Sequence, residues 1–277
     1  MLALLRLWAP PLLSVLTVYA FDRAAARRGL SPPGFVDPLR RAPFLVLLAL
    51  VLAFGVFAGL ATVGVSESPD FSAVPTAQLF LLHVLFLVTL ACWYAMGWGG
   101  FAPAGGSHAR ELASQLGLRA VRLDVELGIG VLAGLAGWLG VLTILVGVGL
   151  VIYAVGGQGA LPEAPPAAIV WIAGLPVALR LALALSAGVV EELFFRGFLQ
   201  PRLGLAGATC LFVLAHLSYD QPLMLVGITL LSLFYGALVI WRQSLWAAIV
   251  AHALFDAVQL LVVIPLALRF VPAGGGG

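Results

Sequence analysis

The sequence VVEELFFRGF, residues 189–198, places three ionisable side chains in an otherwise apolar segment. Glu192 and Arg196 are four residues apart, so on a helix they share a face and can form an ion pair. Glu191 points about 100° away from Glu192 around the helix axis, and the local arginine does not neutralise it. A carboxylate without a partner in apolar surroundings is a candidate general base. The segment therefore predicts acid–base chemistry centred on Glu191.

Two later apolar segments carry further candidate side chains. His216 ends the stretch LFVLAHL, while AHALFDAV holds His252 and Asp256 four residues apart on one helical face. Imidazoles and carboxylates are the groups that most often move protons in hydrolytic enzymes. The expected catalytic residues are Glu191, His216, His252 and Asp256. The expected supporting pair is Glu192 and Arg196.

The charges of these groups do not balance. Three carboxylates and one guanidinium leave a net charge of −2 while the histidines are neutral. A proton on a carboxylate, a protonated histidine or a bound cation would each relieve this charge. The first gives a general base and the last a hydrolytic metal site, so both lead to an activated water. Histidine and carboxylate ligands that leave one coordination position open for water suit zinc. Its candidate ligands are His216, His252, Asp256 and Glu191.

The composition indicates that helices in a membrane must position these groups. Of the 277 residues, 62% are hydrophobic and 9% are charged, whereas a soluble domain is about 25% charged. We expect an all-α polytopic membrane protein, a bundle of about eight transmembrane helices around an intramembrane polar cavity. The apolar segments are approximately 5–21, 44–65, 77–97, 127–155, 170–199, 205–219, 222–241 and 245–268.

The arginines predict the orientation of the bundle. The loop at residues 22–43 holds five of them and the loop at 99–126 holds three, whereas the loops at 67–70 and 156–166 hold acids and no arginine. Arg202 and Arg242 fall in later turns on the arginine-rich side. Because arginine is enriched in cytoplasmic loops, this side is predicted to face the cytoplasm, with both chain ends outside.

The sequence predicts three parts of the chain. Residues 1–126 form N-terminal transmembrane helices and cytoplasmic loops, 127–270 a catalytic transmembrane core, and 271–277 a flexible glycine-rich tail. Cys92 and Cys210 lie in apolar runs without metal-binding spacing and are interpreted as packing residues. His83 has no partner in the sequence pattern and is interpreted as a core or cavity histidine. Arg180 is expected to line the cavity or to pair with Asp220.

The three motifs together resemble a known family. EELFFR fits an EExxxR motif, FVLAH an FxxxH motif and HALFD an HxxxN/D motif. In this order and spacing, residues 170–265 are similar to the CPBP family of intramembrane proteases, which contains the CAAX prenyl-protein endopeptidase of the Rce type. The resemblance implies an eight-helix bundle whose cavity opens toward the cytoplasmic side.

The resemblance also implies peptide-bond hydrolysis and assigns roles. Glu191 would activate the water, His216 would orient or protonate, and His252 with Asp256 would stabilise the oxyanion. Glu192 and Arg196 would support the site as a structural pair. Asp256 stands where the prenyl endopeptidases carry Asn, and an ionised Asp cannot donate a hydrogen bond to an oxyanion. It would be protonated, orient His252 or help to hold a metal.

The predicted function is therefore an intramembrane endopeptidase of a bacterial-type plasma (inner) membrane. Its expected partners are the lipid bilayer and a membrane-associated protein or peptide substrate. No basic tract with aromatic residues points to nucleic acid. The alternatives are a non-proteolytic scaffold or immunity protein of the same fold, and an ion- or proton-coupled transporter. No internal repeat supports the transporter. Two mechanisms remain open: a glutamate mechanism without a cofactor, and a metalloprotease mechanism with zinc.

Overall fold

The computed structural model describes the whole chain except residues 1, 63–73, 99–106, 161–164, 220 and 271–277. The protein is 87% helical, and the described residues contain no strand, so the all-α prediction is confirmed. The glycine-rich tail expected at 271–277 lies outside the described residues.

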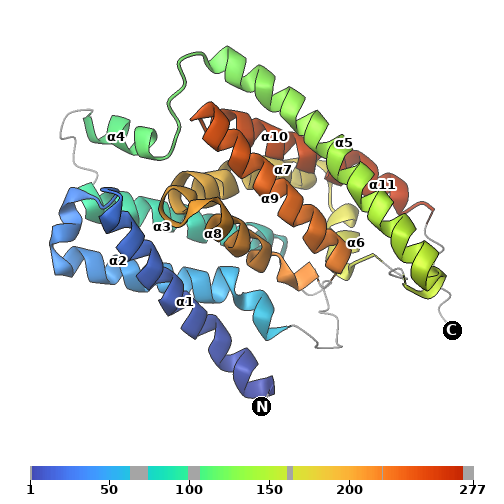
Figure 1. The fold of residues 1–277 in the computed structure, drawn as a ribbon, viewed down its shortest axis with the longest axis horizontal. Helices are drawn as coiled ribbons and strands as arrows, with labels where there is room; N and C mark the ends of the chain where they lie inside the picture. Colours follow the sequence, from blue (N-terminus) through green and yellow to red (C-terminus); the bar gives the residue numbers. More distant parts are fainter. Residues whose placement is uncertain (1, 63–73, 99–106, 161–164, 220, 271–277) are drawn as a thin grey trace.

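The α-helices follow one another along the chain with few irregular connections (Figure 1). They are α1 (Leu2–Arg27), α2 (Pro38–Val51), α3 (Leu81–Trp98), α4 (Ser107–Gln115), α5 (Leu123–Gly156), α6 (Ala167–Gly174), α7 (Val177–Glu191), α8 (Gln200–Ala215), α9 (Pro222–Arg242), α10 (Trp246–Val258) and α11 (Ile264–Ala267). Three π-helical segments extend neighbouring helices: η2 (Leu52–Val56), η7 (Glu192–Leu199) and η9 (Gln259–Val263). Short 3-10 turns are η1 (Pro33–Val36), η3 (Ala58–Ala61), η5 (Thr76–Phe80), η6 (Gln158–Ala160) and η8 (Leu217–Tyr219).

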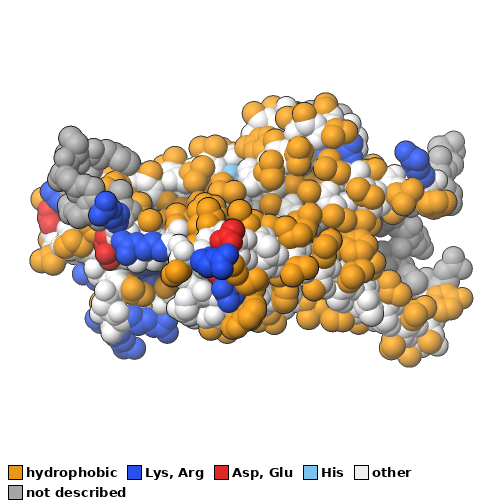
Figure 2. Space-filling model, turned by 90° about the horizontal axis from the view of Figure 1, so that it is seen from above, with side chains coloured by type: hydrophobic (Ala, Val, Ile, Leu, Met, Phe, Trp, Pro, Cys, Tyr) orange, Lys and Arg blue, Asp and Glu red, His pale blue; other side chains and the backbone are white. Residues whose placement is uncertain are grey.

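Five helical segments in the described part of the chain are long and apolar enough to cross a membrane. They are Pro38–Val56, Thr76–Trp98, Leu123–Gly156, Pro222–Arg242 and Trp246–Ala267. Hydrophobic side chains also cover most of the molecular face in Figure 2, as expected where lipid replaces water as the solvent. The polytopic membrane prediction is confirmed by these segments.

One expected span is interrupted. The apolar segment 170–199 is divided between α6 and α7 at Leu175 and Pro176, where Leu175 is extended (φ −70°, ψ 155°). A residue before proline avoids the helical conformation, which explains the break at this position. The remainder of that segment continues without interruption through α7 into η7.

The arginine-rich loops meet at one end of the bundle. At this end Arg28 donates to the Pro201 carbonyl (2.6 Å), and the Leu245 amide donates to the Gly117 carbonyl (2.8 Å). The connection between α1 and α2 and the helix α4 lie at the left of Figure 1, whereas α6 and α11 lie at the right. The start of α1 and the helix α11 lie away from the connection between α1 and α2 (Figure 1).

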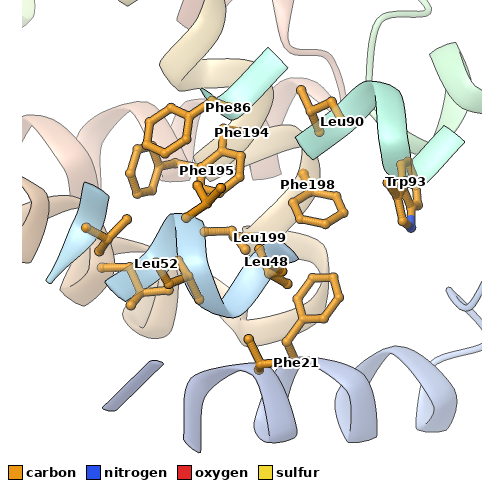
Figure 3. Packing of buried hydrophobic residues seen from close by; sticks show 14 of the residues in the cluster. Phe21, Leu48, Leu52, Phe86, Leu90, Trp93, Phe194, Phe195, Phe198 and Leu199 are labelled. Carbon is orange, nitrogen blue, oxygen red and sulfur yellow. The ribbon is translucent and has the colours of Figure 1, made fainter. Parts of the chain in front are cut away.

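An aromatic core holds η7 against the N-terminal helices. Phe86 of α3 stacks on Phe194 of η7 with ring centroids 4.0 Å apart, and Trp93 packs edge-on against Phe198 (5.1 Å). Figure 3 shows these rings filling the space between α2, α3 and η7. The core keeps the π-helical segment in place directly after Glu191. Such π-helical segments are frequent at functional sites.

Helix α10 is central to the C-terminal half and packs against α5 and α7. The approach of α7 depends on Gly188, because a Cβ there would lie 2.6–2.8 Å from the Ala253 backbone nitrogen, Cα and Cβ. These distances are too short for any side chain without backbone movement. Gly188 therefore brings the glutamates of α7 and η7 within reach of the His252 side chain on α10.

Candidate active site

The candidate residues surround one cavity of about 390 Å³. Its lining is mainly apolar and comes from α3, α5 to α11 and the turns between them. Every residue expected to be catalytic from the sequence lines this cavity. These residues are Glu191, His216, His252 and Asp256. His83 of α3 lines the same cavity, although the sequence pattern does not connect it to the motifs.

The supporting pair is fully buried. The Arg196 guanidinium lies 3.0 Å from Glu192 Oε1, and the two side chains are 1% and 0% exposed. The guanidinium also lies over the Phe212 ring, 4.2 Å from its centroid, which adds a cation–π contact. Glu192 does not line the cavity, so the ion pair lies behind the wall that the catalytic residues form.

His252 contacts a carboxylate at each ring nitrogen. Its Nδ1 lies 2.8 Å from Glu192 Oε1, and its Nε2 lies 3.5 Å from Asp256 Oδ2. An imidazole donates from both nitrogens only when it is protonated. A protonated His252 between these two carboxylates would correspond to the second of the three ways to relieve the charge. Asp256 lies beside the His252 ring, a position from which it could orient that ring.

His216 lies at the C-terminal end of α8, next to the Phe212 ring. Its Nδ1 is 2.7 Å from the Phe212 carbonyl oxygen, so Nδ1 carries a proton and donates it to that carbonyl. The other nitrogen, Nε2, is then the one that can exchange a proton with a bound molecule. The centroid of the Phe212 ring lies 4.6 Å from that of His216 and 6.1 Å from that of His252, so both histidines lie beside this ring.

His216 and His252 come from different helices and line the same cavity. Helix α8 contains Gly204 at φ 78°, ψ 172°, where the backbone is not helical. Glycine adopts this positive φ without the steric cost that a side chain would bring. The resulting kink reorients the last three turns of α8, and His216 reaches the same cavity as His252.

His83 is the residue that sequence reasoning missed. Its Nε2 lies 3.3 Å from Glu191 Oε1, and its Nδ1 lies 3.0 Å from the Ser186 hydroxyl. The side chain is buried and comes from a helix 108 residues earlier in the chain. The sequence does show an ionisable side chain in an apolar span, where such groups are costly and therefore often functional. That observation alone does not indicate which residue His83 contacts.

Two arginines make contacts that the sequence did not indicate. Arg180 donates to the Leu260 carbonyl (2.8 Å) of η9, a segment that lines the cavity. Asp220, its other expected partner, lies outside the described residues. Arg202 is 1% exposed, and it donates to the Phe198 carbonyl (2.6 Å). Three aromatic rings surround its guanidinium, which compensates part of the desolvation.

The cavity extends away from the arginine-rich loops. Beyond the catalytic residues, its lining includes Ile169 near the start of α6, Tyr219 of η8 and Ile264 of α11. Of these elements, α6 and α11 lie at the opposite end of the bundle from α4 (Figure 1). The opening of the site toward the arginine-rich side stays a prediction.

The arrangement does not fit a metal centre. Within the described ranges, no three His, Cys, Asp or Glu side chains are grouped so that they could hold one ion. His252 has a carboxylate at each nitrogen, and the Nδ1 of His216 faces a backbone carbonyl. A metal bound to His252 would have to displace Glu192 or Asp256. The residues present therefore fit a metal-free acid–base site better than a zinc site.

Comparisons with known proteins agree with the motifs. Residues 173–258 match the profile of the family described as "Type II CAAX prenyl endopeptidase Rce1-like". A curated protein of Bacillus subtilis (strain 168), "Uncharacterized protein YpbD", is 35% identical over 69 residues. That match covers 24% of this chain and 36% of the relative. No solved structure gives a significant match.

The matched family segment contains all three motifs and both glutamates, but it does not reach His83 on α3. At family level it supports a CAAX-type intramembrane protease. The resemblance that the motifs indicate is thereby confirmed: residues 173–258 match the Rce1-like family, which is consistent with the CPBP family.

Proposed function

We propose that this protein is an intramembrane endopeptidase in which Glu191 activates a water molecule. The observation that carries the proposal is the position of Glu191 Oε2. This oxygen is buried, it belongs to a cavity-lining side chain, and it has no hydrogen-bond partner among the described residues. A buried carboxylate oxygen left without a protein partner needs an explanation. A water held at Oε2 would supply one, and Oε2 would be its base.

The reaction would follow the usual course of water-mediated peptide hydrolysis. Glu191 takes a proton from water, and the hydroxide attacks the carbonyl carbon of the scissile bond. Negative charge then develops on the carbonyl oxygen, where cationic His252 would stabilise it. The carbon–nitrogen bond breaks as the leaving nitrogen receives the proton from Glu191, either directly or through His216 Nε2, which would take that proton from Glu191 and pass it on. The products are a carboxylic acid and an amine, which exchange a proton to give a carboxylate and an ammonium group.

Asp256 would act through His252 in this scheme. It lies 3.5 Å from His252 Nε2, so it can hold the ring and favour its protonated form, while an ionised carboxylate does not itself donate to the oxyanion. The mainly apolar cavity would accept an apolar part of a membrane-associated protein or peptide. No step requires a metal or another cofactor.

The proposed location is the plasma (inner) membrane of a bacterial cell, with the arginine-rich end in the cytoplasm. The extension of the cavity toward α6 and α11 would then lie in the outer half of the bilayer. The substrate would therefore enter from within the membrane or from its outer side.

A comparison of membrane-protein termini tests the proposal. Cells of the source species would carry the wild-type chain, Glu191→Gln or the control Glu111→Gln, which changes an exposed glutamate on α4. Loss of a general base lowers turnover by about 10²–10⁴-fold. We expect new protein termini with the wild type and the control, and their loss with Glu191→Gln.

Two results would count against this function. If the folded Glu191→Gln variant gives the same termini as the wild type, Glu191 takes no part in the reaction. Identical termini with and without the wild-type chain would instead indicate a non-proteolytic scaffold or immunity protein built on the same fold.

A further inference from the structure

The contacts of His83 allow one arrangement in which every contact is a hydrogen bond. The Ser186 hydroxyl lies 3.0 Å from the Leu183 carbonyl of its own helix and 3.0 Å from His83 Nδ1. The hydroxyl has one hydrogen, so both contacts are hydrogen bonds only when it donates to Leu183 and accepts from His83 Nδ1–H. This arrangement sets the tautomer on which the proposal below is built.

This tautomer leaves Nε2 facing a carboxylate. A neutral ring protonated at Nδ1 has a lone pair at Nε2, and that lone pair would face Glu191 Oε1 at 3.3 Å. Two acceptors at this distance repel each other unless a proton lies between them. Since Glu191 needs to be ionised to accept a proton from water, the proton between the two groups belongs on His83 Nε2.

We propose that His83 is the counter-cation of Glu191, a positioning residue that keeps the catalytic carboxylate ionised and turns Oε2 toward the cavity. This inference rests on the proposed function and extends it to a helix outside the three motifs. Oε1 is engaged by the His83 ring, so Oε2 is the oxygen that meets the water. Ser186 and Glu191 both lie on α7, and the ring of His83 therefore connects α3 to α7 at the site.

The proposal also resolves the charge imbalance. Three carboxylates, those of Glu191, Glu192 and Asp256, face the guanidinium of Arg196 and two imidazolium rings, those of His83 and His252. The net charge of the group is then zero, without a metal and without a proton on any carboxylate. The other titratable groups lining the cavity are His216, Tyr219 and Tyr235, and none of them needs a charge in this arrangement.

The proton transfers of the reaction also balance in this arrangement. Oε2 receives one proton from water while Oε1 stays in contact with protonated His83. The proton on Oε2 then passes to the leaving nitrogen, and the pair of carboxylate and imidazolium is restored. His83 neither gains nor loses a proton, which is why it is a positioning residue and not a catalytic one.

Nuclear magnetic resonance of the histidine ring nitrogens tests the ion pair without any substrate. The purified full-length chain contains four histidines, and the His83 signals are assigned by their loss in His83→Gln. We expect both His83 nitrogens to carry protons in the wild type, and only Nδ1 to carry one in Glu191→Gln. A neutral His83 in the wild type, or a proton pattern that Glu191→Gln leaves unchanged, overturns the proposal.

Kinetics test the positioning role. The probe is an internally quenched peptide spanning a cleavage site identified by the comparison of termini. A misoriented base costs roughly 100-fold, so we expect His83→Gln to lower kcat by that factor with KM unchanged. Ser186→Ala removes one hydrogen bond and should lower kcat roughly fivefold. The control is Thr89→Val. In the wild type the Thr89 hydroxyl donates to the Leu85 carbonyl of the same helix (2.8 Å), so this change also removes one side-chain hydrogen bond.

The two measurements separate the possible failures. Wild-type kcat in folded His83→Gln overturns the positioning role, whatever the resonance data show. A wild-type chain that cleaves no membrane protein contradicts the proposed function, while the ring-nitrogen signals still decide whether His83 and Glu191 form the ion pair.

Discussion

Glu192 Oε1 accepts a hydrogen bond from His252 Nδ1 at 2.8 Å and lies 3.0 Å from the Arg196 guanidinium. One carboxylate oxygen therefore holds both the local arginine and a histidine that is 60 residues distant in the chain. The supporting pair of the EExxxR motif does more than compensate its own charges, because it also orients the imidazole that faces the cavity. The first glutamate of the motif faces the cavity, while the second keeps the wall in place.

Breaking the supporting pair should destabilise the protein. Arg196→Ala leaves Glu192 buried with one partner removed, and breaking a buried pair in this way costs about 3–5 kcal/mol. We expect a clear fall in the thermal unfolding temperature in detergent micelles. The control is Arg40→Ala, which breaks the half-exposed pair with Asp37 and should change stability by less than about 1 kcal/mol. Equal melting of wild type and Arg196→Ala would contradict the structural role.

The orienting role of Asp256 predicts a difference between two substitutions. Asp256→Asn keeps the size of the side chain and a polar contact with His252 Nε2, so turnover should persist. Asp256→Leu removes the contact and should lower kcat by about 10²–10³-fold, as expected when a group stabilising the oxyanion is misplaced. Equal loss in both variants would show instead that the negative charge at this position is essential.

Metal analysis distinguishes the two mechanisms that the sequence leaves open. If two imidazolium rings balance the carboxylates, the purified protein should contain far less than one equivalent of zinc, and chelators should not change turnover. Elemental analysis and a titration with chelator measure both quantities. About one equivalent of zinc, lost together with activity in His216→Ala and His252→Ala, would establish a metal mechanism instead.

Labelling of single cysteines tests the orientation. If the arginine-rich end faces the cytoplasm, a membrane-impermeant thiol reagent added outside intact cells should not label Ser31→Cys or Ser107→Cys. It should label Gln158→Cys, and also Ser68→Cys, a position that lies outside the described residues. Permeabilised cells provide the control for accessibility. The reverse pattern would place the arginine-rich loops outside and invert the predicted topology.

Much of the site could be predicted from local spacing. The i, i+4 spacing places Arg196 beside Glu192 and Asp256 beside His252, because four residues return a helix to nearly the same face. Both contacts are present in the structure. The division between Glu191 and Glu192 follows from the same geometry, since adjacent residues on a helix point about 100° apart.

The sequence by itself thus determined a membrane-embedded helical protein, the three motifs and the pairs within one helix. Only the tertiary structure decided which helix faces meet: His83 with Glu191, His252 with Glu192, and Arg202 with its surrounding aromatic rings. The physical reason is that α3 and α5 are apolar around their whole circumference, so no polar face shows which side contacts a neighbour. In lipid, close packing and a few buried polar contacts choose that side, and those contacts join residues too distant in the chain for any local pattern to reveal.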